Sequence, residues 1–171
     1  MMNIVPFLRE KLPLPKTFKD TLFLRSFTLF KVPMLFFIGP RVLELTESTT
    51  VIEIPLNYRT KNHLGSMYFA VLAAGADCAG GVAASKLIYE SGQPVSLVFK
   101  NFKADFLKRP HDNVIFVCKQ GVEIKQLIQK AIETKERQEL PLHIEAFCPK
   151  KFKEEPVARF VLTLSVKFKP T

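Results

Sequence analysis

The chain has 171 residues, of which 47% are hydrophobic and 24% charged, and its net charge is +9. This length and mixture fit one globular domain with a substantial core, so they exclude a disordered chain. The positive charge favours an anionic partner, but no helix-turn-helix, zinc-finger or single-strand-binding motif is present, so we expect no nucleic-acid binding.

The first 40 residues are rich in proline, phenylalanine and basic side chains. Phe18, Leu22 and Leu29 recur at helical spacing and predict a helix that runs to Lys31 and is ended by Pro33. We interpret this stretch as a segment packed over a sheet, with contact to a membrane surface as the alternative. It is too short and too charged for a transmembrane span. No signal peptide is evident, so we expect a cytoplasmic protein.

Two strands are predicted next, over 41–46 and 50–56, because apolar and polar residues alternate there. A long helix follows, with Ser66 as its N-cap or in its first turn, and ends near Glu90. Its first five turns contain a single charged side chain, Asp77. A helix without a polar face is expected to be buried nearly all round. A carboxylate in that position is costly unless it is paired, hydrogen-bonded or protonated.

The second half of the chain is predicted as four strands and one amphipathic surface helix. The apolar alternation changes phase near Lys100 and Asn101, which predicts a β-bulge. Consecutive long strands favour an antiparallel sheet, and a sheet that wraps the apolar helix explains the missing polar face. The expected strands span 95–106, 114–119, 140–148 and 160–168, and the expected surface helix spans 121–138.

The spacing of residues around the start of the long helix resembles that of a known family. Asn62 stands six residues before the triplet Tyr68-Phe69-Ala70, and Asp77 stands nine residues after Tyr68. The segment Ala104-Asp105-Phe106-Leu107-Lys108-Arg109-Pro110 also resembles the third strand of that family and the turn after it. The chain is similar to hotdog-fold acyl-CoA thioesterases, most of all to the phenylacetate-pathway (PaaI-like) thioesterases and an uncharacterised neighbouring branch.

The resemblance implies an α+β hotdog fold, an antiparallel sheet wrapped around a long central helix with an N-terminal helical extension. The likeness covers roughly 41–170. We expect an N-terminal extension over 1–40 that packs on a hotdog domain over 41–171. The family forms homodimers, and whether two dimers join into a tetramer stays open.

The resemblance also implies an acyl-CoA hydrolase whose site lies at the dimer interface. Asp77 is then the general base or nucleophile, and Asn62 orients water or the carbonyl group. Backbone amides of Phe69 or Ala70 from the other chain hold the oxyanion, because Asp77 lies roughly 10–12 Å along the same helix from these amides, too far for both groups of one chain to reach one carbon. The expected substrate-binding residues are Tyr68, His63, Gly65, Lys108 and Arg109.

Lys108 and Arg109 are expected at a turn, where they are either solvated or contact the phosphates of coenzyme A or an acidic acyl carrier protein. The coenzyme A thioester is the substrate, and we expect no further cofactor and no metal. The three cysteines form no CxxC pair and are expected to be buried, reduced thiols.

The triplet departs from the His-Gly-Gly of the family, and this favours an alternative function, non-catalytic binding of acyl-CoA or acyl carrier protein. Asp77 is then a structural anchor or a ligand contact, and Asn62 ties its own loop. His63 is equally consistent with a loop residue bonded to backbone. A third alternative is a basic peripheral membrane protein that uses residues 1–40. His111 and His143 are interpreted as structural or surface residues.

Overall fold

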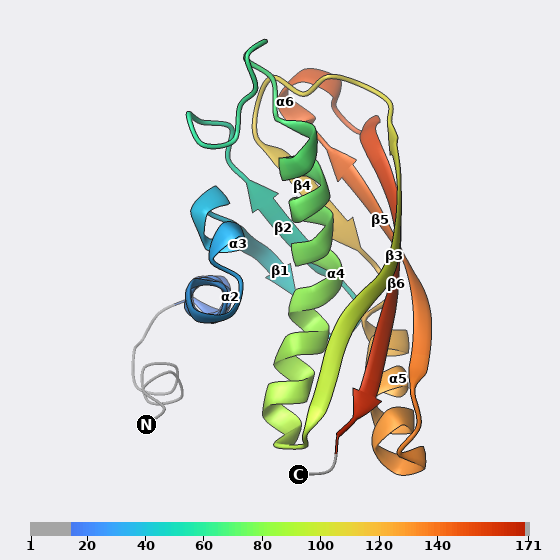
Figure 1. Cartoon of the computed structure of the whole chain (residues 1–171). Helices are drawn as coiled ribbons and strands as arrows, with labels where there is room; N and C mark the ends of the chain where they lie inside the picture. The colour runs from blue at the N-terminus through green and yellow to red at the C-terminus, as the bar shows by residue number, and fades with distance from the viewer. Residues whose placement is uncertain (1–14, 170–171) are drawn as a thin grey trace.

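The computed structural model describes residues 15–169, so the first 14 residues of the predicted extension lie outside the described part. A six-stranded antiparallel sheet wraps one long helix, as the sequence predicts (Figure 1). The strand order is β1-β2-β4-β5-β6-β3. The elements are α2 (Lys16–Lys31), α3 (Pro33–Ile38), β1 (Arg41–Leu45), β2 (Thr50–Ile54), α4 (Phe69–Ser91), β3 (Val95–Phe106), β4 (Val114–Cys118), α5 (Gly121–Thr134), β5 (Gln138–Phe147), α6 (Pro149–Phe152) and β6 (Pro156–Phe168).

Helix α4 is the core helix around which the sheet curves (Figure 1). Its small residues allow close packing: a Cβ added at Gly75 would lie 2.3 Å from the ring of Phe116 on β4. α4 also has the length and hydropathy of a membrane span, but 67% of its most apolar window is buried inside the fold. That burial is what the core helix of a globular domain shows.

Strand β3 forms one edge of the sheet and, within residues 15–169, pairs with β6 alone. Its register with β6 shifts between Phe99 and Phe102, which confirms the predicted bulge. Its outer edge is open along 12 residues. Val98, Phe102 and Phe106 are each about half exposed on this strand, at 52%, 46% and 48%. An open edge with apolar side chains is a surface that favours pairing with another chain.

Helix α2 packs on the opposite flank of α4 from β3 (Figure 1). A buried ion pair joins Asp20 to Lys86 of α4 at 3.1 Å. The backbone amide of Val42 in β1 donates to the Thr21 hydroxyl at 2.9 Å. The Arg25 guanidinium donates to the Gly39 carbonyl, at the end of α3. These contacts attach α2 to both layers of the fold.

The boundaries differ from the prediction at several places. The long helix begins at Phe69, with Tyr68 at the N-cap position, so the prediction of Ser66 as cap was wrong. The Ser66 hydroxyl instead bonds Asn62. α5 ends at Thr134, earlier than predicted, because Lys135 adopts a left-handed conformation that stops the helix. A short helix, α3, follows directly after the predicted stop at Pro33.

The stripe that predicted α2 faces outward rather than onto the sheet. Phe18, Leu22 and Leu29 are 53%, 38% and 43% exposed. The buried residues of α2 lie on the other side of the helix: Asp20, Phe23, Leu24 and Thr28. The expected cysteine state is confirmed, since all three cysteines are buried and free.

Candidate active site

The first turn of α4 presents free backbone donors. The backbone amide of Tyr68 donates to the Thr60 carbonyl at 2.9 Å. The amides of Val71 and Leu72 donate to the Tyr68 carbonyl and form the first hydrogen bonds of the helix. Within residues 15–169, the N–H groups of Phe69 and Ala70 have no hydrogen-bond acceptor. Orphan N–H groups at the positive end of a helix dipole are suited to hold a developing negative charge. Ala70 is partly exposed and Phe69 is exposed, so a ligand has access to them.

The loop before α4 is held by Asn62. The side-chain oxygen of Asn62 accepts from the backbone amides of Leu64 and Ser66, and the side-chain NH2 group of Asn62 donates to the Ser66 hydroxyl at 3.0 Å. Gly65 has a φ of +74°, a left-handed conformation that glycine adopts without strain. Asn62 therefore shapes the loop, and its side chain is already engaged there. His63 is exposed at the loop tip.

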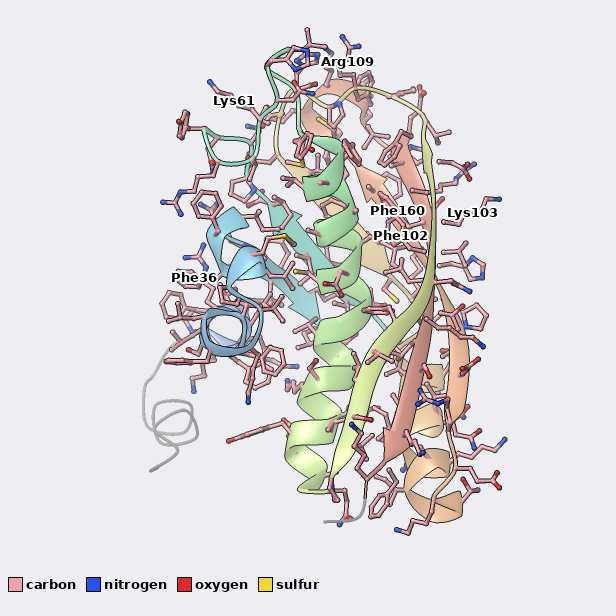
Figure 2. The ribbon with its side chains drawn as sticks, viewed as in Figure 1. Phe36, Lys61, Phe102, Lys103, Arg109 and Phe160 are labelled. Carbon is pink, nitrogen blue, oxygen red and sulfur yellow. The ribbon has the colours of Figure 1, made fainter. Side chains whose placement is uncertain are left out.

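The turn after β3 lies beside this loop, because the amide of Met67 donates to the carbonyl of Pro110 at 2.9 Å. Arg109 is exposed there, near the same end of the molecule as Lys61 (Figure 2). Lys108 is less available, since its ammonium group pairs with Glu155 and lies over the Phe152 ring. The structure thus gathers the predicted substrate-binding residues at the start of α4: Tyr68, His63, Gly65, Lys108 and Arg109.

Asp77 lies two turns further along α4, on the helix face that is not packed on the sheet. It has no hydrogen-bond partner among the described residues. Burial raises the pKa of its carboxyl group from 3.8 to about 6. A carboxylate that titrates near neutral pH without a fixed partner is suited to accept and return a proton.

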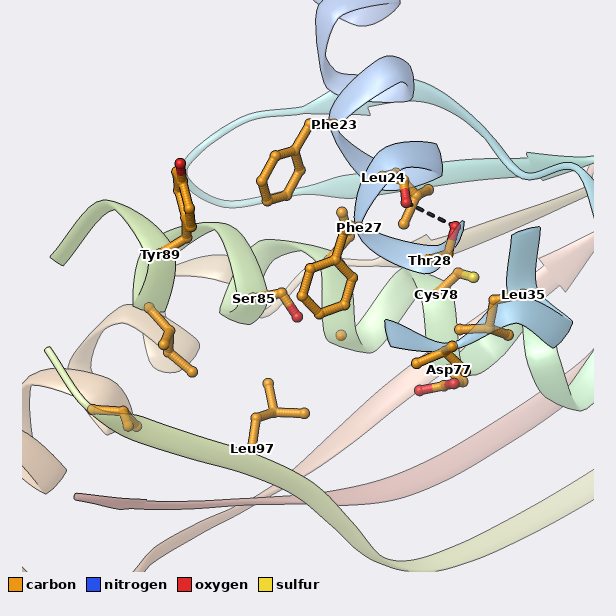
Figure 3. A pocket seen from close by; sticks show the side chains of 15 residues that line it. Phe23, Leu24, Phe27, Thr28, Leu35, Asp77, Cys78, Ser85, Tyr89 and Leu97 are labelled. Carbon is orange, nitrogen blue, oxygen red and sulfur yellow. Dashed lines mark hydrogen bonds between the residues drawn. The ribbon is translucent and has the colours of Figure 1, made fainter. Parts of the chain in front are cut away.

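An apolar cavity of about 380 Å³ begins at Asp77 and runs between α4, α2 and β3. Figure 3 shows Asp77 and Tyr89 at opposite ends of it, with Phe27 of α2 between them. Its volume falls within the usual range of small-molecule sites, about 300–1,000 Å³. Sequence patterns did not predict this cavity. It is lined by Phe23, Leu24, Phe27, Thr28, Val32, Leu35, Asp77, Cys78, Gly81, Val82, Ser85, Ile88, Tyr89, Val95 and Leu97.

Cys78 is the one thiol in this lining. Burial and the neighbouring charge of Asp77 raise the pKa of the Cys78 thiol far above neutral. A thiol that stays protonated is a poor nucleophile, so Cys78 is a packing residue of the cavity wall. Between residues 15 and 169, no group of three or more acidic, histidine or cysteine side chains is placed to hold a metal ion.

The two halves of the predicted site lie apart in one chain. Asp77 is eight residues after Phe69, which places it about 12 Å along the helix at 1.5 Å per residue. The free amides and the carboxylate therefore cannot act on the same carbon from one copy of α4. The cavity extends from Asp77 in the direction away from these amides, toward Ser85 and Tyr89 (Figure 3).

A family model described as "Domain of unknown function (DUF4442)" matches residues 20–166. The match begins within α2, so the helix that forms one cavity wall is part of the family's common domain. No curated protein matches this chain in sequence.

Solved structures show the same fold at low sequence identity. A protein of unknown function from Chlorobaculum tepidum aligns with a TM-score of 0.76 and 13% identity, covering 90% of this chain and 97% of the other. A Pseudomonas aeruginosa protein described as a probable thioesterase aligns with a TM-score of 0.69 and 22% identity, covering 92% of this chain and 99% of the other. A thioesterase from Haemophilus influenzae aligns with a TM-score of 0.61 and 18% identity, covering 82% of this chain and 87% of the other. The hotdog fold predicted from the sequence is therefore confirmed.

Proposed function

We propose that this chain, which belongs to the DUF4442 family, is an acyl-thioester hydrolase that acts on acyl-CoA or acyl carrier protein, with Asp77 as its catalytic base. One observation carries the proposal. Asp77 is the charged end of an otherwise apolar cavity, and the pKa of its carboxyl group is raised to about 6 by burial. A folded protein retains such an unpaired carboxylate at a cost, which is typical of functional sites.

The acyl chain lies in the cavity in this proposal. Asp77, Gly81 and Ser85 are four residues apart, so they share one face of α4 and line the cavity floor. The cavity extends from Asp77 to Tyr89, about 18 Å along the helix. An extended chain advances about 1.2 Å per bond, so with the thioester at Asp77 the cavity fits linear acyl groups of up to about 15 carbons.

The oxyanion is held by a second copy of the chain, since one copy cannot supply both groups. Two β3 edges that pair antiparallel about a two-fold axis also place the two α4 helices antiparallel. The start of one helix then lies toward Asp77 of the other. The exposed aromatic groups Phe69 and Phe106, whose ring centroids are 6.3 Å apart, flank this edge and would be covered in the dimer.

The reaction needs only water and the thioester. Asp77 takes a proton from water as the water oxygen bonds to the carbonyl carbon, and the carbonyl oxygen becomes negative. The N–H groups of Phe69 and Ala70 from the second copy donate to that oxygen. The carbonyl then re-forms, the carbon–sulfur bond breaks, and the leaving sulfur takes the proton from Asp77. The products are a carboxylic acid and the free thiol.

The carrier of the acyl group contacts the end of the molecule where α4 begins. Arg109 and His63 are exposed there, and Lys61 extends the basic surface. Guanidinium and ammonium groups bind phosphates, so this end is suited to the phosphates of coenzyme A or to phosphopantetheine on an acidic carrier. Asn62 acts indirectly by shaping the loop. The buried free thiols support a reducing compartment such as the cytoplasm.

Non-catalytic binding of acyl thioesters is a second candidate, and the first turn of α4 favours it. Tyr68 and Phe69 place two bulky rings, 4.8 Å apart, beside the free amides. Both are exposed, by 44% and 58%, so they narrow the approach to those amides. A protein that binds the acyl chain in the cavity yet never brings the carbonyl to the amides would carry acyl groups without hydrolysing them.

Thiol release from a panel of acyl-CoAs, from acetyl to palmitoyl, tests the two candidates. We expect turnover that rises with chain length up to about 15 carbons, and a loss of about 100-fold or more in Asp77→Asn, the usual effect of removing a general base. Glu90→Gln is the matched control, because it removes an exposed carboxylate from the same helix outside the cavity. Tight acyl-CoA binding with no thiol release would contradict hydrolysis and support the carrier. Equal activity of Asp77→Asn and the wild type would remove Asp77 from the mechanism.

A further inference from the structure

The outer surface formed by α2 and α3 is unusually apolar for a face of a folded chain. Phe30 is 78% exposed, and Met34 is 62% exposed, at the bend where α2 meets α3. Large exposed apolar areas mark sites of contact with proteins or membranes. We call this surface the α2–α3 face, and its exposed apolar residues are Phe18, Leu22, Leu29, Phe30, Val32, Met34, Phe36 and Phe37.

The exposed charge of the α2–α3 face is all positive. Lys16 and Lys31 are exposed at the two ends of α2, and Lys19 is partly exposed along its side. Asp20 is the one acidic residue of the two helices, and it is 1% exposed because it points inward to Lys86. The face therefore offers apolar side chains on a helix whose exposed charges, Lys16, Lys19 and Lys31, are all ammonium groups, and no acid on these helices offsets them at the surface.

This combination is that of an interfacial helix. Phe18, Leu22 and Leu29 share one stripe along the 16 residues of α2, so the stripe is about 24 Å long and faces away from the core. An apolar stripe on a helix with lysines at both ends lies in the plane of a membrane surface, with the apolar groups among acyl chains and the long lysine side chains reaching the lipid phosphates. Phe30 and Met34 are the most exposed apolar residues of the α2–α3 face, so we expect them to enter the bilayer first.

We propose that the α2–α3 face binds the surface of a membrane that contains anionic lipids. A second copy of the chain is the other conceivable occupant, but the open β3 edge lies on the opposite flank of α4 (Figure 1). Figure 2 likewise places Phe36 on the flank opposite Phe102 and Lys103. Pairing through β3 therefore leaves the α2–α3 face uncovered. The positive charge of the face matches an anionic lipid surface and opposes a second copy of itself.

The position of α2 links this surface to the cavity. Phe23, Leu24 and Thr28 point from the inner side of α2 into the cavity wall, while the stripe of Phe18 and Leu22 points outward. One helix, about 10 Å across, thus separates the docked bilayer from the cavity. Insofar as the proposed hydrolysis holds, docking brings the site next to acyl thioesters that have partitioned into the membrane.

Sedimentation of the full chain with vesicles tests the docking directly and needs no enzymatic activity. We expect binding to vesicles of phosphatidylcholine with phosphatidylglycerol, much weaker binding to phosphatidylcholine alone, and weakening by added salt. Phe30→Asp and Met34→Asp should each lower the partition coefficient about tenfold or more. Val122→Asp is the matched control, because Val122 is a 47% exposed apolar residue on α5; its effect should stay below about twofold.

Three outcomes would overturn the proposal. The first is the absence of a preference for anionic vesicles. The second is an equal loss of binding in Phe30→Asp and Val122→Asp, since that would reflect charge alone. The third is a smaller assembly of Phe30→Asp in analytical ultracentrifugation, which would assign the face to a second copy. Circular dichroism melts of the variants check that the folded state is kept. We expect it to be kept, because Phe30 and Met34 lie outside the cavity lining.

Discussion

Helix α4 uses glycine in opposite ways on its two faces. On the sheet face, a Cβ at Gly75 would lie 2.3 Å from the Phe116 ring, so glycine there permits close contact of helix and strand. On the cavity face, a Cβ at Gly81 would meet its nearest neighbours at 3.7 Å, an ordinary contact distance. The same residue type therefore allows dense packing on one side and leaves space for a ligand on the other.

The charge on α4 follows the same division. Between Phe69 and Ser85, α4 has one charged group, Asp77, which lies on the cavity face without a partner among the described residues. A second charge further along, Lys86, is neutralised by Asp20 of α2. The comparison teaches that the sheet face is optimised for stability and that the cavity face keeps features that reduce stability. Substitutions on the two faces should therefore separate stability from activity.

The largest effect on stability is expected on the sheet face. Gly75→Ala forces a methyl group into the Phe116 ring and should lower the free energy of unfolding by about 3 kcal/mol, the upper part of the range for overpacking. Urea denaturation measures this change. Gly80→Ala is the control, since its Cβ would meet the mobile end of Leu142 at 3.2 Å and should cost less. A loss below about 1 kcal/mol in Gly75→Ala would contradict the packing assigned to this face.

Asp77→Asn should change the free energy of unfolding in the opposite direction: the variant should lose activity and gain stability. The pKa of the carboxyl group is about 6 in the folded protein, against 3.8 for an aspartate side chain in water. The folded protein therefore holds the extra proton between these values, and the free energy of unfolding falls as the pH rises from about 4 to about 6. The asparagine variant lacks this dependence. At pH 8 the asparagine variant should be more stable than the wild type by up to about 3 kcal/mol, and at pH 4 by little.

Thermal melts of both proteins between pH 4 and pH 8 measure this difference. A constant difference across that range would show that Asp77 does not titrate near neutral pH in the folded chain. The same ionisation should appear in catalysis, because the carboxylate is the active form of a general base. We expect the rate of thiol release to rise with pH through about 6 and then level off, and a flat profile would assign the base to another group.

The smallest effect on stability is expected at Gly81, where selectivity should change instead. Gly81→Ala should raise the free energy of unfolding by about 1 kcal/mol, because alanine favours helix over glycine. The added methyl group narrows the cavity, so the preferred acyl chain should become shorter while acetyl-CoA hydrolysis is kept. Gly80→Ala lies outside the cavity lining and should leave the chain-length profile unchanged. Identical profiles in both variants would exclude the cavity as the acyl site.

Much of this fold could be predicted from local patterns. The order of strands and helices follows from apolar periodicity, and the phase change near Lys100 located the bulge because each residue on a strand alternates sides. The start of α4 could not be placed, since the Ser66 hydroxyl bonds Asn62 and not the helix. The end of α5 was also missed, because Lys135 takes a left-handed conformation that sequence associates with glycine.

The candidate site was predicted in part. Asp77 stood out as a lone charge in an apolar helix, and the structure shows it half buried and unpartnered within the described chain. The cavity and the place of Gly81 in its lining were missed. Both depend on the distance at which α2 packs from α4, and a sequence contains no signal for that distance. The contrast between Gly80 and Gly81 is likewise invisible in sequence, since adjacent glycines on one helix differ only in what lies opposite them.

The position of α2 has a consequence for how such proteins diversify. The cavity floor, with Asp77, belongs to the central helix and its sheet, whereas Phe23, Leu24 and Phe27 of the opposite wall precede the first strand. Substitutions in that one early segment can reshape the space available to a ligand while leaving the scaffold that carries the carboxylate untouched. Part of the ligand range is thereby encoded in a stretch of the chain that is separate from the carboxylate.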